Sequence, residues 1–576
     1  MSPMDSRKLP AMPRPTLYNG LVACLLSVAI GYVIGSPNIP EAAIRGSPGG
    51  GCGPVEYTIQ GGFPNCLQFS DLLWGFAIGS FCLGACIGSL SGATIQTRHG
   101  RKRTMVLSDA LFIFGSLVIS LSYQQAQFII GRMVLGFACG LAGVVTPSYL
   151  NEISTVRSRG TMGTFHQLFL VVGLLISNLV GLIWTDPPGW RVTLAMNGVP
   201  SVLHLMLIRT VVESPKFLLA RGHIEQGRRV LQKLRGSELD VDIEIEFSEM
   251  VRTASGGDPQ MEPMTVVEAH REQLVQQPLD PQADLEGEKF NNNPLFVVER
   301  GDSAATIAVV SSTQTSAAGR AIPKTDFQDK ERQSPCKDDT QEAYTIITLF
   351  RSECRSLALV GISIHFLQQA SGINGLVYYS TSFLSTVFGN GESTSRLITL
   401  GVSCCNMVCT LLGVFLINRL PRRTLLLLSM GGISLSALLL IIGAYAKVGI
   451  LVVVAVFLYI ATFAIALGPI PWMLLSEMLP TYALDAGSAV ATAVNWGTNF
   501  IIGLLFPTLS NALGNATFIL FGGFTVLGFF YVLRFVPETR NRSVESVMAS
   551  KGISMRNADK NCSSTAAAVA AAAIQH

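Results

Sequence analysis

Long uncharged hydrophobic segments recur along the chain, separated from one another by charged residues, proline or glycine. The hydrocarbon core of a bilayer is about 30 Å thick, so a helix that crosses it needs about 20 apolar residues. Pro507 and the polar residues 511–515 divide the last uncharged stretch into two such segments. The pattern predicts twelve transmembrane helices, near residues 17–36, 71–93, 105–123, 126–147, 161–183, 191–211, 355–386, 396–417, 424–446, 449–474, 487–509 and 516–535.

The composition supports the same class of protein. Of the 576 residues, 49% are hydrophobic and only 14% are charged, and the mean hydropathy is +0.44, whereas a soluble domain has about 25% charged residues. We therefore expect an all-α integral membrane protein. The sequence has no metal-ligand cluster, P-loop or hydrolase motif, so we predict no enzyme activity, cofactor or metal site. Its basic residues are scattered over span ends, which argues against nucleic-acid binding.

Lysine and arginine in the short loops predict the orientation, because cytoplasmic loops hold the excess of these residues. One side has fifteen of them, and the other side has only Arg45, Arg191, Arg396 and Lys447. Both termini and the long central segment are therefore predicted to be cytoplasmic. The expected organisation is a tail at 1–16, a six-helix bundle at 17–212, a linker at 213–353, a second six-helix bundle at 354–536 and a tail at 537–576.

The linker at 213–353 differs in composition from the rest of the chain, with 25 acidic and 16 basic residues. It begins with a short helical pattern at 213–236 and then becomes rich in Asp, Glu, Gln, Ser and Pro, which predicts disorder over most of its length. Two roles stay open for it, a solvated connection between the halves or a region that binds a regulatory partner. Cys52 and Cys66 share the outer loop 37–70, where a disulfide between them is also open.

Charged motifs recur at corresponding span ends of the two halves, about 321 to 325 residues apart. Such a repeat predicts two similar bundles with the substrate site between them, near the middle of the membrane. The excess of positive charge in cytoplasmic loops explains the arginines of these motifs, but it does not explain the glutamates. The matching segments are RHGRK at 98–102 with RLPRR at 419–423, Glu152 with Glu477, and ESPK at 213–216 with PETR at 537–540.

We expect acids and bases of the two halves to form ion pairs that close the cytoplasmic end. In the first half Arg159 follows Glu152 by seven residues, whereas the residue seven places after Glu477 is Leu484. The predicted gate residues are Arg101, Lys102, Glu152, Arg159, Glu213, Arg422, Arg423, Glu477 and Glu538.

Seven short segments follow one another in a distinctive order. They are GRMVLGFACG at 131–140, PSYLNEISTVRSRGTMGTFHQL at 147–168, ESPKFLL at 213–219, QQASGIN..VYYST at 368–381, GPIPW at 468–472, NWGTNF at 495–500 and FVPETR at 535–540. Together they resemble the sugar porter family of the major facilitator superfamily, and within it the facilitative glucose-transporter (GLUT-like) branch and its fungal relatives. The resemblance covers all twelve spans. It implies a major facilitator fold of two six-helix pseudo-repeats that transports a sugar by alternating access.

The resemblance implies a hexose held by side-chain amides and indoles. Each sugar hydroxyl donates and accepts hydrogen bonds, so neutral amides bind it without the desolvation cost of a buried charge, and aromatic rings cover its CH faces. Amides inside a membrane also join helices to one another, and that structural role is the alternative at each position. The implied substrate-binding residues are Gln167, Gln368, Gln369, Asn374, Asn406, Trp472, Asn495, Trp496 and Asn499.

The chain departs from the family pattern at positions that bear on mechanism. Proton-coupled members of the family have an Asp in span 1 where this chain has Val33, and the acid inside the predicted spans is Asp109. Protonatable groups inside a membrane are costly and rare. His204 and His365 lie within spans and can titrate. The span 7 triplet associated with glucose selection in the GLUT-like branch is His-Phe-Leu at 365–367 here.

These observations favour facilitative uniport of a monosaccharide, a hexose in the first place, by a multi-pass membrane protein. Two alternatives stay open. One is a sugar sensor that signals through its cytoplasmic region, and the other is a proton-coupled symporter that uses His204 or His365. The plasma membrane and an internal membrane such as that of the vacuole both fit the prediction.

Overall fold

The computed structural model describes residues 12–46, 64–155, 157–184, 189–236, 243, 246–248, 250–251, 346–378, 392–540 and 542–553. All regular elements in these residues are helices. Twelve helical stretches are long and apolar enough to cross a membrane, which confirms the number predicted from the sequence. Both six-helix halves fall in one unit, and the other unit, Asp258–Ala343, lies outside the described residues.

Each half of the sequence provides six membrane-spanning stretches. Those of the first half are α1 (Arg14–Gly35), α3 (Asp71–His99), α4 (Arg101–Ser120), α5 (Gln125–Ile153), α6 (Arg159–Ile183), and α7 (Trp190–Ala195) joined to α8 (Val199–Leu207) by a 3-10 turn. Those of the second half are α14 (Arg355–Ala370) with α15 (Ile373–Tyr378), α17 (Glu392–Arg419), α18 (Arg422–Tyr445), α19 (Gly449–Thr462) with α20 (Ile470–Met478), α21 (Thr481–Leu513) and α22 (Thr517–Phe535).

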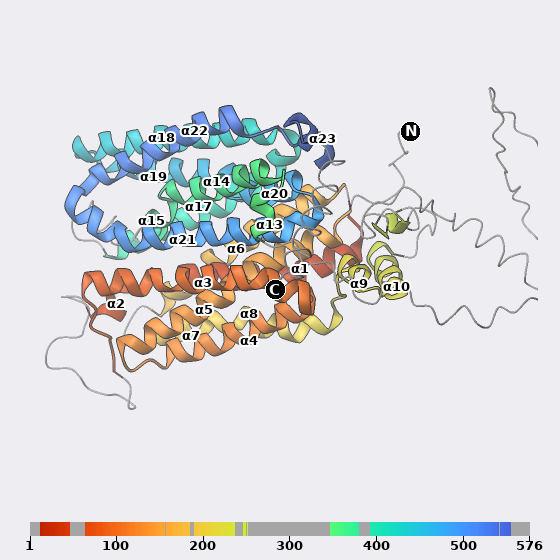
Figure 1. Cartoon of the computed structure of the whole chain (residues 1–576). Helices are drawn as coiled ribbons and strands as arrows, with labels where there is room; N and C mark the ends of the chain where they lie inside the picture. Colours follow the sequence, from red (N-terminus) through yellow and green to blue (C-terminus); the bar gives the residue numbers. More distant parts are fainter. Residues whose placement is uncertain are drawn as a thin grey trace, which may run out of the picture. The chain divides into compact units, whose positions relative to one another are not determined.

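The helices pack closely where small residues let their backbones approach. In the first half α3 packs on α5 and α1 packs on α6. A side chain at Gly136 of α5 would collide with the carbonyl of Phe81 in α3, so this contact requires glycine. In Figure 1, α4, α5, α7 and α8 lie on one side and α18, α19 and α22 on the other. The two halves meet where α3 packs against α21 and α6 packs against α17.

Two spans of the second half are interrupted in the middle. The predicted span 355–386 breaks between α14 and α15 at Gly372, whose φ of +81° disfavours any other residue. The tenth span changes from α-helix to π-helix at Phe463–Leu467 and resumes as α20 after Gly468 and Pro469. Both interruptions expose backbone groups inside the bundle, where side chains have to satisfy them.

The last two spans separate within the predicted polar stretch 511–515, but the helix does not break at Pro507. α21 continues through Pro507 to Leu513, and the chain turns at Gly514, whose φ is +55°. Membrane helices tolerate proline because neighbouring groups satisfy the carbonyl that it leaves open. α21 also begins six residues before the predicted start at 487, so Asp485 lies inside this helix.

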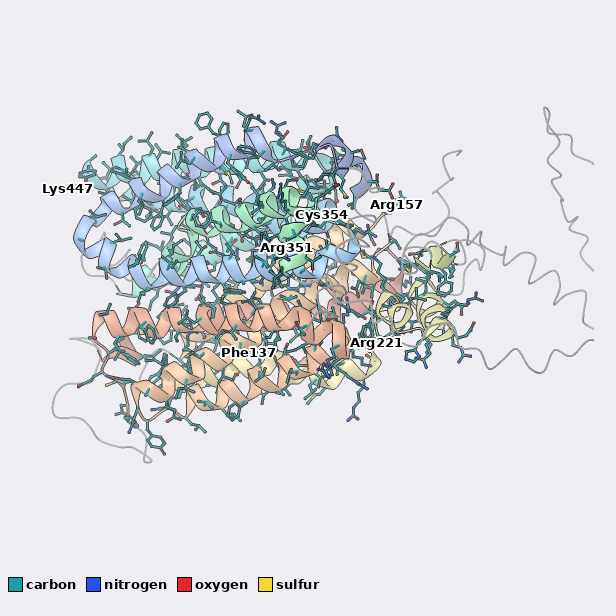
Figure 2. The ribbon with its side chains drawn as sticks, viewed as in Figure 1. Phe137, Arg157, Arg221, Arg351, Cys354 and Lys447 are labelled. Carbon is teal, nitrogen blue, oxygen red and sulfur yellow. The ribbon has the colours of Figure 1, made fainter. Side chains whose placement is uncertain are left out.

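The turns between helices lie at two opposite ends of the bundle. Figure 2 labels Lys447 at one end, and Arg157 and Arg221 at the other. We call the second one the ion-pair end, because it includes Arg101 at the start of α4 and Arg422 at the start of α18. The sequence assigned Lys447 and Arg157 to opposite sides of the membrane, and the structure places them at opposite ends.

The segment after the sixth span is helical at its start, as predicted, but it forms two short helices where the sequence pattern predicted one over 213–236. They are α9 (Pro215–Ala220) and α10 (Ile224–Arg235). Arg235 holds them to the bundle, because its Nη1 donates to the carbonyl of Ile153 at 2.8 Å while its Nη2 pairs with Glu246 at 2.6 Å.

Several predictions fall on residues that the structure does not describe. The stretch expected to be disordered, 250–342, lies outside the described residues except for its first two positions. Cys66 is disulfide-bonded, but Cys52 lies outside the described residues, so the pairing of these two cysteines stays a prediction.

Candidate functional site

Four amide side chains of the second half form one hydrogen-bonded network. Gln369 donates from Nε2 to Oδ1 of Asn495 at 2.9 Å, and Asn495 donates from Nδ2 to Oε1 of Gln368 at 2.6 Å. Asn374 extends the network by donating to Oε1 of Gln369. The sequence predicted all four residues, and the structure brings them together from α14, α15 and α21.

Gln368 is anchored on the irregular part of the tenth span. In a regular α-helix the carbonyl of Leu467 would accept from residue 471, but Pro471 has no N–H to donate. The Nε2 atom of Gln368 donates to that carbonyl at 2.9 Å and to the carbonyl of Gly468 at 2.8 Å. Because buried carbonyls need partners, Gln368 connects the middle of α14 to the bend before α20.

Trp472 lies between two histidines, one from each half. Its ring centroid is 5.1 Å from that of His166 in α6 and 5.0 Å from that of His365 in α14, and both contacts are edge-on. Nδ1 of His166 shares a hydrogen bond with the hydroxyl of Ser27 at 2.9 Å. Nε2 of His166 and Nδ1 of His365 have no hydrogen-bond partner among the described residues, so each can bond to a ligand.

A group of aromatic side chains lies beside the amide network. Trp496 and Tyr378 both contact Phe81 of α3 edge-on, with ring centroids 5.6 Å and 6.2 Å apart. Asn499, one helical turn after Asn495, donates to the hydroxyl of Tyr378 at 2.9 Å. These rings provide flat apolar faces next to hydrogen-bonding groups, which is the combination that a sugar ring requires.

A cavity lies between the two halves, bounded by Trp472 and His365 and extending toward Asn151, next to Glu152 of the ion-pair end. Its walls include the hydroxyls of three serines and a threonine and the amide of Asn151, but no Asp, Glu, Lys or Arg, so its surface is neutral and partly polar. The lining residues are Gly143, Val144, Pro147, Ser148, Asn151, His365, Trp472, Leu475, Ser476, Leu484, Ser488 and Thr492.

Gln167 and Asn406 occupy different surroundings from the amide network. Gln167 of α6 is 7% exposed, and its Nε2 faces Gly468 across the contact between the halves. Asn406 of α17 accepts a hydrogen bond from Thr410, one turn further along the same helix, at 3.4 Å. The structure therefore places Gln167 next to the bend of the tenth span but does not bring Asn406 into hydrogen-bonding contact with the network.

The charges at the ion-pair end pair within each half. Arg101 pairs with Glu152 at 2.7 Å, and Arg422 pairs with Glu477 at 3.1 Å. The two pairs are equivalent in the internal repeat. Glu152, Arg422 and Glu477 therefore pair within their own half, contrary to the prediction of pairs between the halves, whereas Arg101 also pairs with an acid of the second half, as described below. Each arginine begins a helix of the same half as its glutamate, so the partner within the half is already in reach.

The other predicted gate residues make local contacts. Lys102 donates from Nζ to the carbonyl of Val211 at 2.7 Å, and Arg423 donates to the carbonyl of Leu533. Arg159 is half-buried and forms no ion pair with another described residue.

Glu213 and Glu538 accept hydrogen bonds from backbone N–H groups at the starts of α4 and α18. Burial raises the pKa of the Glu213 carboxyl, and three backbone N–H donors oppose that shift by stabilising the carboxylate. Both glutamates thus serve as helix caps, because they satisfy donors that a helix start leaves open.

One acid that the sequence analysis missed joins the two halves. Asp485 of α21 lies 3.4 Å from Nη2 of Arg101 and accepts a hydrogen bond from Gln96 of α3 at 3.2 Å. The predicted start of this span at 487 left Asp485 in a loop. The sequence contained one signal. Asp485 directly follows Leu484, and Leu484 is the position that corresponds to Arg159 in the first half.

An Asp–His pair and an arginine are buried within the first half. Asp109 of α4 pairs with His204 of α8 at 2.7 Å, and both side chains are fully buried. Arg132 of α5 donates to the carbonyl of Val33 at 3.0 Å and to that of Ile78 at 3.2 Å. Val33, which stands where proton-coupled members of the family have an Asp, therefore contacts Arg132 through its backbone carbonyl.

The fold and the site define a membrane transporter of the major facilitator type. The chain belongs to the "Sugar (and other) transporter" family, whose model matches residues 20–276 and 290–549. This membership confirms the resemblance found in the sequence and identifies a multi-pass integral membrane transporter, not an enzyme.

Individual relatives agree with this assignment. The solute carrier family 2, facilitated glucose transporter member 3 of Oryctolagus cuniculus is 28% identical over 540 residues, which cover 91% of this chain and 90% of that protein. The probable metabolite transport protein CsbC of Bacillus subtilis is 27% identical, with 84% and 88% covered. The proton:xylose symporter XylE bound to 6-bromo-6-deoxy-D-glucose has the same fold, with a TM-score of 0.67, 20% identity, and 93% and 98% covered.

The sequence analysis also missed two residues of the candidate site. His166 and Tyr378 both lie inside segments that were recognised, at 147–168 and 368–381, but neither was assigned to the site. Both pack against predicted residues, Trp472 and Asn499 respectively. A search for aromatic and imidazole groups on the faces that bear the predicted amides would have found them.

Proposed function

We propose that this protein transports a monosaccharide, a hexose in the first place, across a membrane by facilitative uniport with alternating access. The observation that carries the proposal is the neutral network of Gln368, Gln369 and Asn495. Asn495 also donates to the backbone carbonyl of His365, whose ring contacts Trp472, and Trp472 contacts His166 of the first half. The name of its rabbit relative, a facilitated glucose transporter, supports the same class of substrate.

The network suits reversible binding. Its amides satisfy one another when no ligand is bound, so a sugar hydroxyl that inserts between them exchanges one set of hydrogen bonds for another at small net cost. The aromatic side chains of Trp472 and Trp496 complement the CH faces of the ring. Neither step involves a charge, so the direction of transport follows the sugar gradient.

Uniport is supported by the residues around the start of the first span. The family's proton-coupled members have a carboxylate where this chain has Val33, and Arg132 bonds to the backbone carbonyl of Val33. A backbone carbonyl cannot take up and release a proton in the physiological range, so this position lacks a coupling group.

For the gate and the orientation, we propose that the ion-pair end faces the cytoplasm, together with both termini and the linker. The excess of arginine at that end supports this orientation. The pairs Arg101–Glu152 and Arg422–Glu477 then brace the cytoplasmic end of each half, and Glu213 and Glu538 hold the helices that bear the arginines.

Counterflow in proteoliposomes tests the proposal. Purified protein in vesicles loaded with unlabelled sugar should accumulate the matching labelled sugar from a panel of hexoses, pentoses and polyols, in a saturable manner. Uptake should be equal at pH 6 and pH 7.5 without a proton gradient. Vesicles with the Asn495→Ala protein provide the control, because this change removes the central member of the network. Absence of counterflow for every sugar in the panel would reject sugar transport.

A second candidate is proton-coupled sugar transport. The fully buried Asp109–His204 pair favours it, since a carboxylate and an imidazole inside a membrane span often move protons. Accumulation of sugar driven by an inward proton gradient, and abolished by a protonophore, would replace uniport with this mechanism. The sensor hypothesis depends on the linker, and deletion of 258–343 with retained counterflow would separate transport from signalling.

A further inference from the structure

One ion pair at the ion-pair end joins the two halves of the protein. Asp485 of α21, in the second half, lies 3.4 Å from Arg101 at the start of α4, in the first half. Gln96, near the end of α3, donates to the same carboxylate at 3.2 Å. The Arg101–Glu152 pair stays within the first half. Among the described residues, Asp485 is therefore the acid whose ion pair crosses from one half to the other.

α21 connects Asp485 to the amide network as one uninterrupted helix. Ser488, Thr492, Asn495 and Asn499 follow Asp485 by 3, 7, 10 and 14 residues, so all five lie on one helical face. Ser488 and Thr492 line the cavity, and Asn495 belongs to the network. With a rise of 1.5 Å per residue, about 15 Å of helix separates Asp485 from Asn495. One continuous helix therefore links the two residues.

α21 packs antiparallel to α3 over most of its length. Gly79 of α3 faces the ring of Phe500 near one end, whereas Gln96 bonds to Asp485 near the other. Since α3 belongs to the first half and α21 to the second, opening of the ion-pair end has to separate Asp485 from Gln96 and Arg101. The contact can exist only while that end is closed.

We propose that Asp485 is a gate residue of this chain, which latches the ion-pair end through Arg101 and Gln96 and is coupled by α21 to the sugar-binding amide of Asn495. The proposal rests on the transport function proposed above. At the position equivalent to Arg159 the second half has the uncharged Leu484, and the acid that follows Leu484 forms the ion pair that crosses between the halves.

The latch acts on the balance between conformations and contributes little to overall stability. The Asp485 side chain is 26% exposed, and partly exposed ion pairs stabilise a fold only weakly. A transporter, however, alternates between states of similar free energy. A contact present in one state and absent in the other shifts their populations several-fold.

Labelling of a cysteine at Ser488 tests the proposal. The Ser488→Cys protein is placed in sealed vesicles, and a membrane-impermeant maleimide is added on the side of the ion-pair end, without sugar. The labelling measured for the protein that keeps Ser488 is subtracted as background. Asp485→Ala should raise the labelling rate about fivefold, because the ion-pair end opens more often. Asp485→Glu, which keeps the charge, should stay close to the parent rate.

Glu246→Ala is the matched control, since it removes a carboxylate of similar exposure, 25%, whose ion pair with Arg235 of α10 does not join the two halves. It should leave the labelling rate unchanged. An equal rate in the Asp485→Ala protein and its parent would overturn the proposal, and so would an equal rise in the Glu246→Ala protein. Because the assay contains no sugar, a positive result combined with failed counterflow would reject the transport function and retain the latch.

Discussion

Glu213 and Glu538 make the same contact in the two halves of the protein. Glu213 accepts hydrogen bonds from the first two backbone N–H groups of α4 at 3.1 Å and 3.2 Å. Glu538 accepts from the first two N–H groups of α18 at 2.9 Å and 3.1 Å. A helix start carries partial positive charge and unsatisfied donors, so a carboxylate there stabilises it in two ways. The internal repeat thus preserves a backbone contact that orients the arginines of the ion-pair end.

Replacing either glutamate should destabilise its half by a similar amount. Glu213→Ala and Glu538→Ala each leave two helix N–H groups without a carboxylate, and the loss of a cap of this kind costs about 1 kcal/mol. We expect both variants to lower the melting temperature of the purified protein in detergent. Gln226→Ala, at an exposed position of α10, is the control and should melt with the parent. A melting temperature unchanged in both glutamate variants would contradict the capping role.

The Glu213 carboxyl should also make stability depend on pH. Burial raises its pKa above the ordinary 4.5, so the folded protein holds this proton more tightly than the unfolded chain does. The contribution is fully present below pH 4.5 and is lost as the pH rises through the folded pKa. The difference in melting temperature between the parent and Glu213→Gln should therefore change with pH in the range just above 4.5. A constant difference across that range would show that the folded pKa is not raised.

The sequence predicted the helices better than their interruptions. The length of a hydrophobic segment identifies a span, because it reports burial in lipid. It does not report where the backbone hydrogen bonds of the helix are interrupted. Pro507 and Pro471 illustrate this limit. The helix continues through Pro507, whereas the carbonyl left open by Pro471 bonds to Gln368, a residue about a hundred positions earlier.

The grouping of the amides was predictable, because the resemblance assigned Gln368, Gln369 and Asn495 together and the structure joins them by hydrogen bonds. Their role in binding stays a prediction. The partners of charged residues were harder to predict, because the repeat shows which charges are equivalent but not which ones touch. Asp485 has no counterpart in the repeat, so its contact with Arg101 follows only from the packing of α21 against α3.

Gln368→Leu and Asn495→Ala should each reduce counterflow by about tenfold or more. Each change removes at least one hydrogen bond to the substrate and leaves a buried network partner unsatisfied, which costs about 1–3 kcal/mol. Initial counterflow rates at equal protein per vesicle would measure the effect. Ser436→Ala is a suitable control, because among the described residues this buried hydroxyl bonds to the carbonyl of Gly432 in its own helix and to no other group. Unchanged rates for both amide variants would remove them from the binding site.

Pro471→Ala should slow transport by making the tenth span more regular. Alanine restores an N–H that can bond to the carbonyl of Leu467, and this N–H competes with Gln368 for the same acceptor. We expect slower hydrogen exchange of the backbone from 463 to 471 and a lower counterflow rate at saturating sugar. Pro200→Ala is the matched control, since Pro200 lies in the first turn of α8, where no N–H is needed. Faster exchange in the Pro471→Ala protein would contradict this account of the bend.

Asp109 and His204 decide between uniport and symport. The pair is fully buried between α4 and α8, and neither residue lines the cavity at Trp472. Asp109→Asn keeps a hydrogen-bond acceptor for His204 but removes the group that would carry a proton. Under uniport, the ratio of sugar uptake with and without an inward proton gradient should be one in both the parent and this variant.

His204→Ala should instead destabilise the protein by about 3–5 kcal/mol, because it leaves a buried carboxylate without its partner. A ratio above one in the parent that falls to one in Asp109→Asn would make the pair the proton-coupling site, and the transport would then be symport.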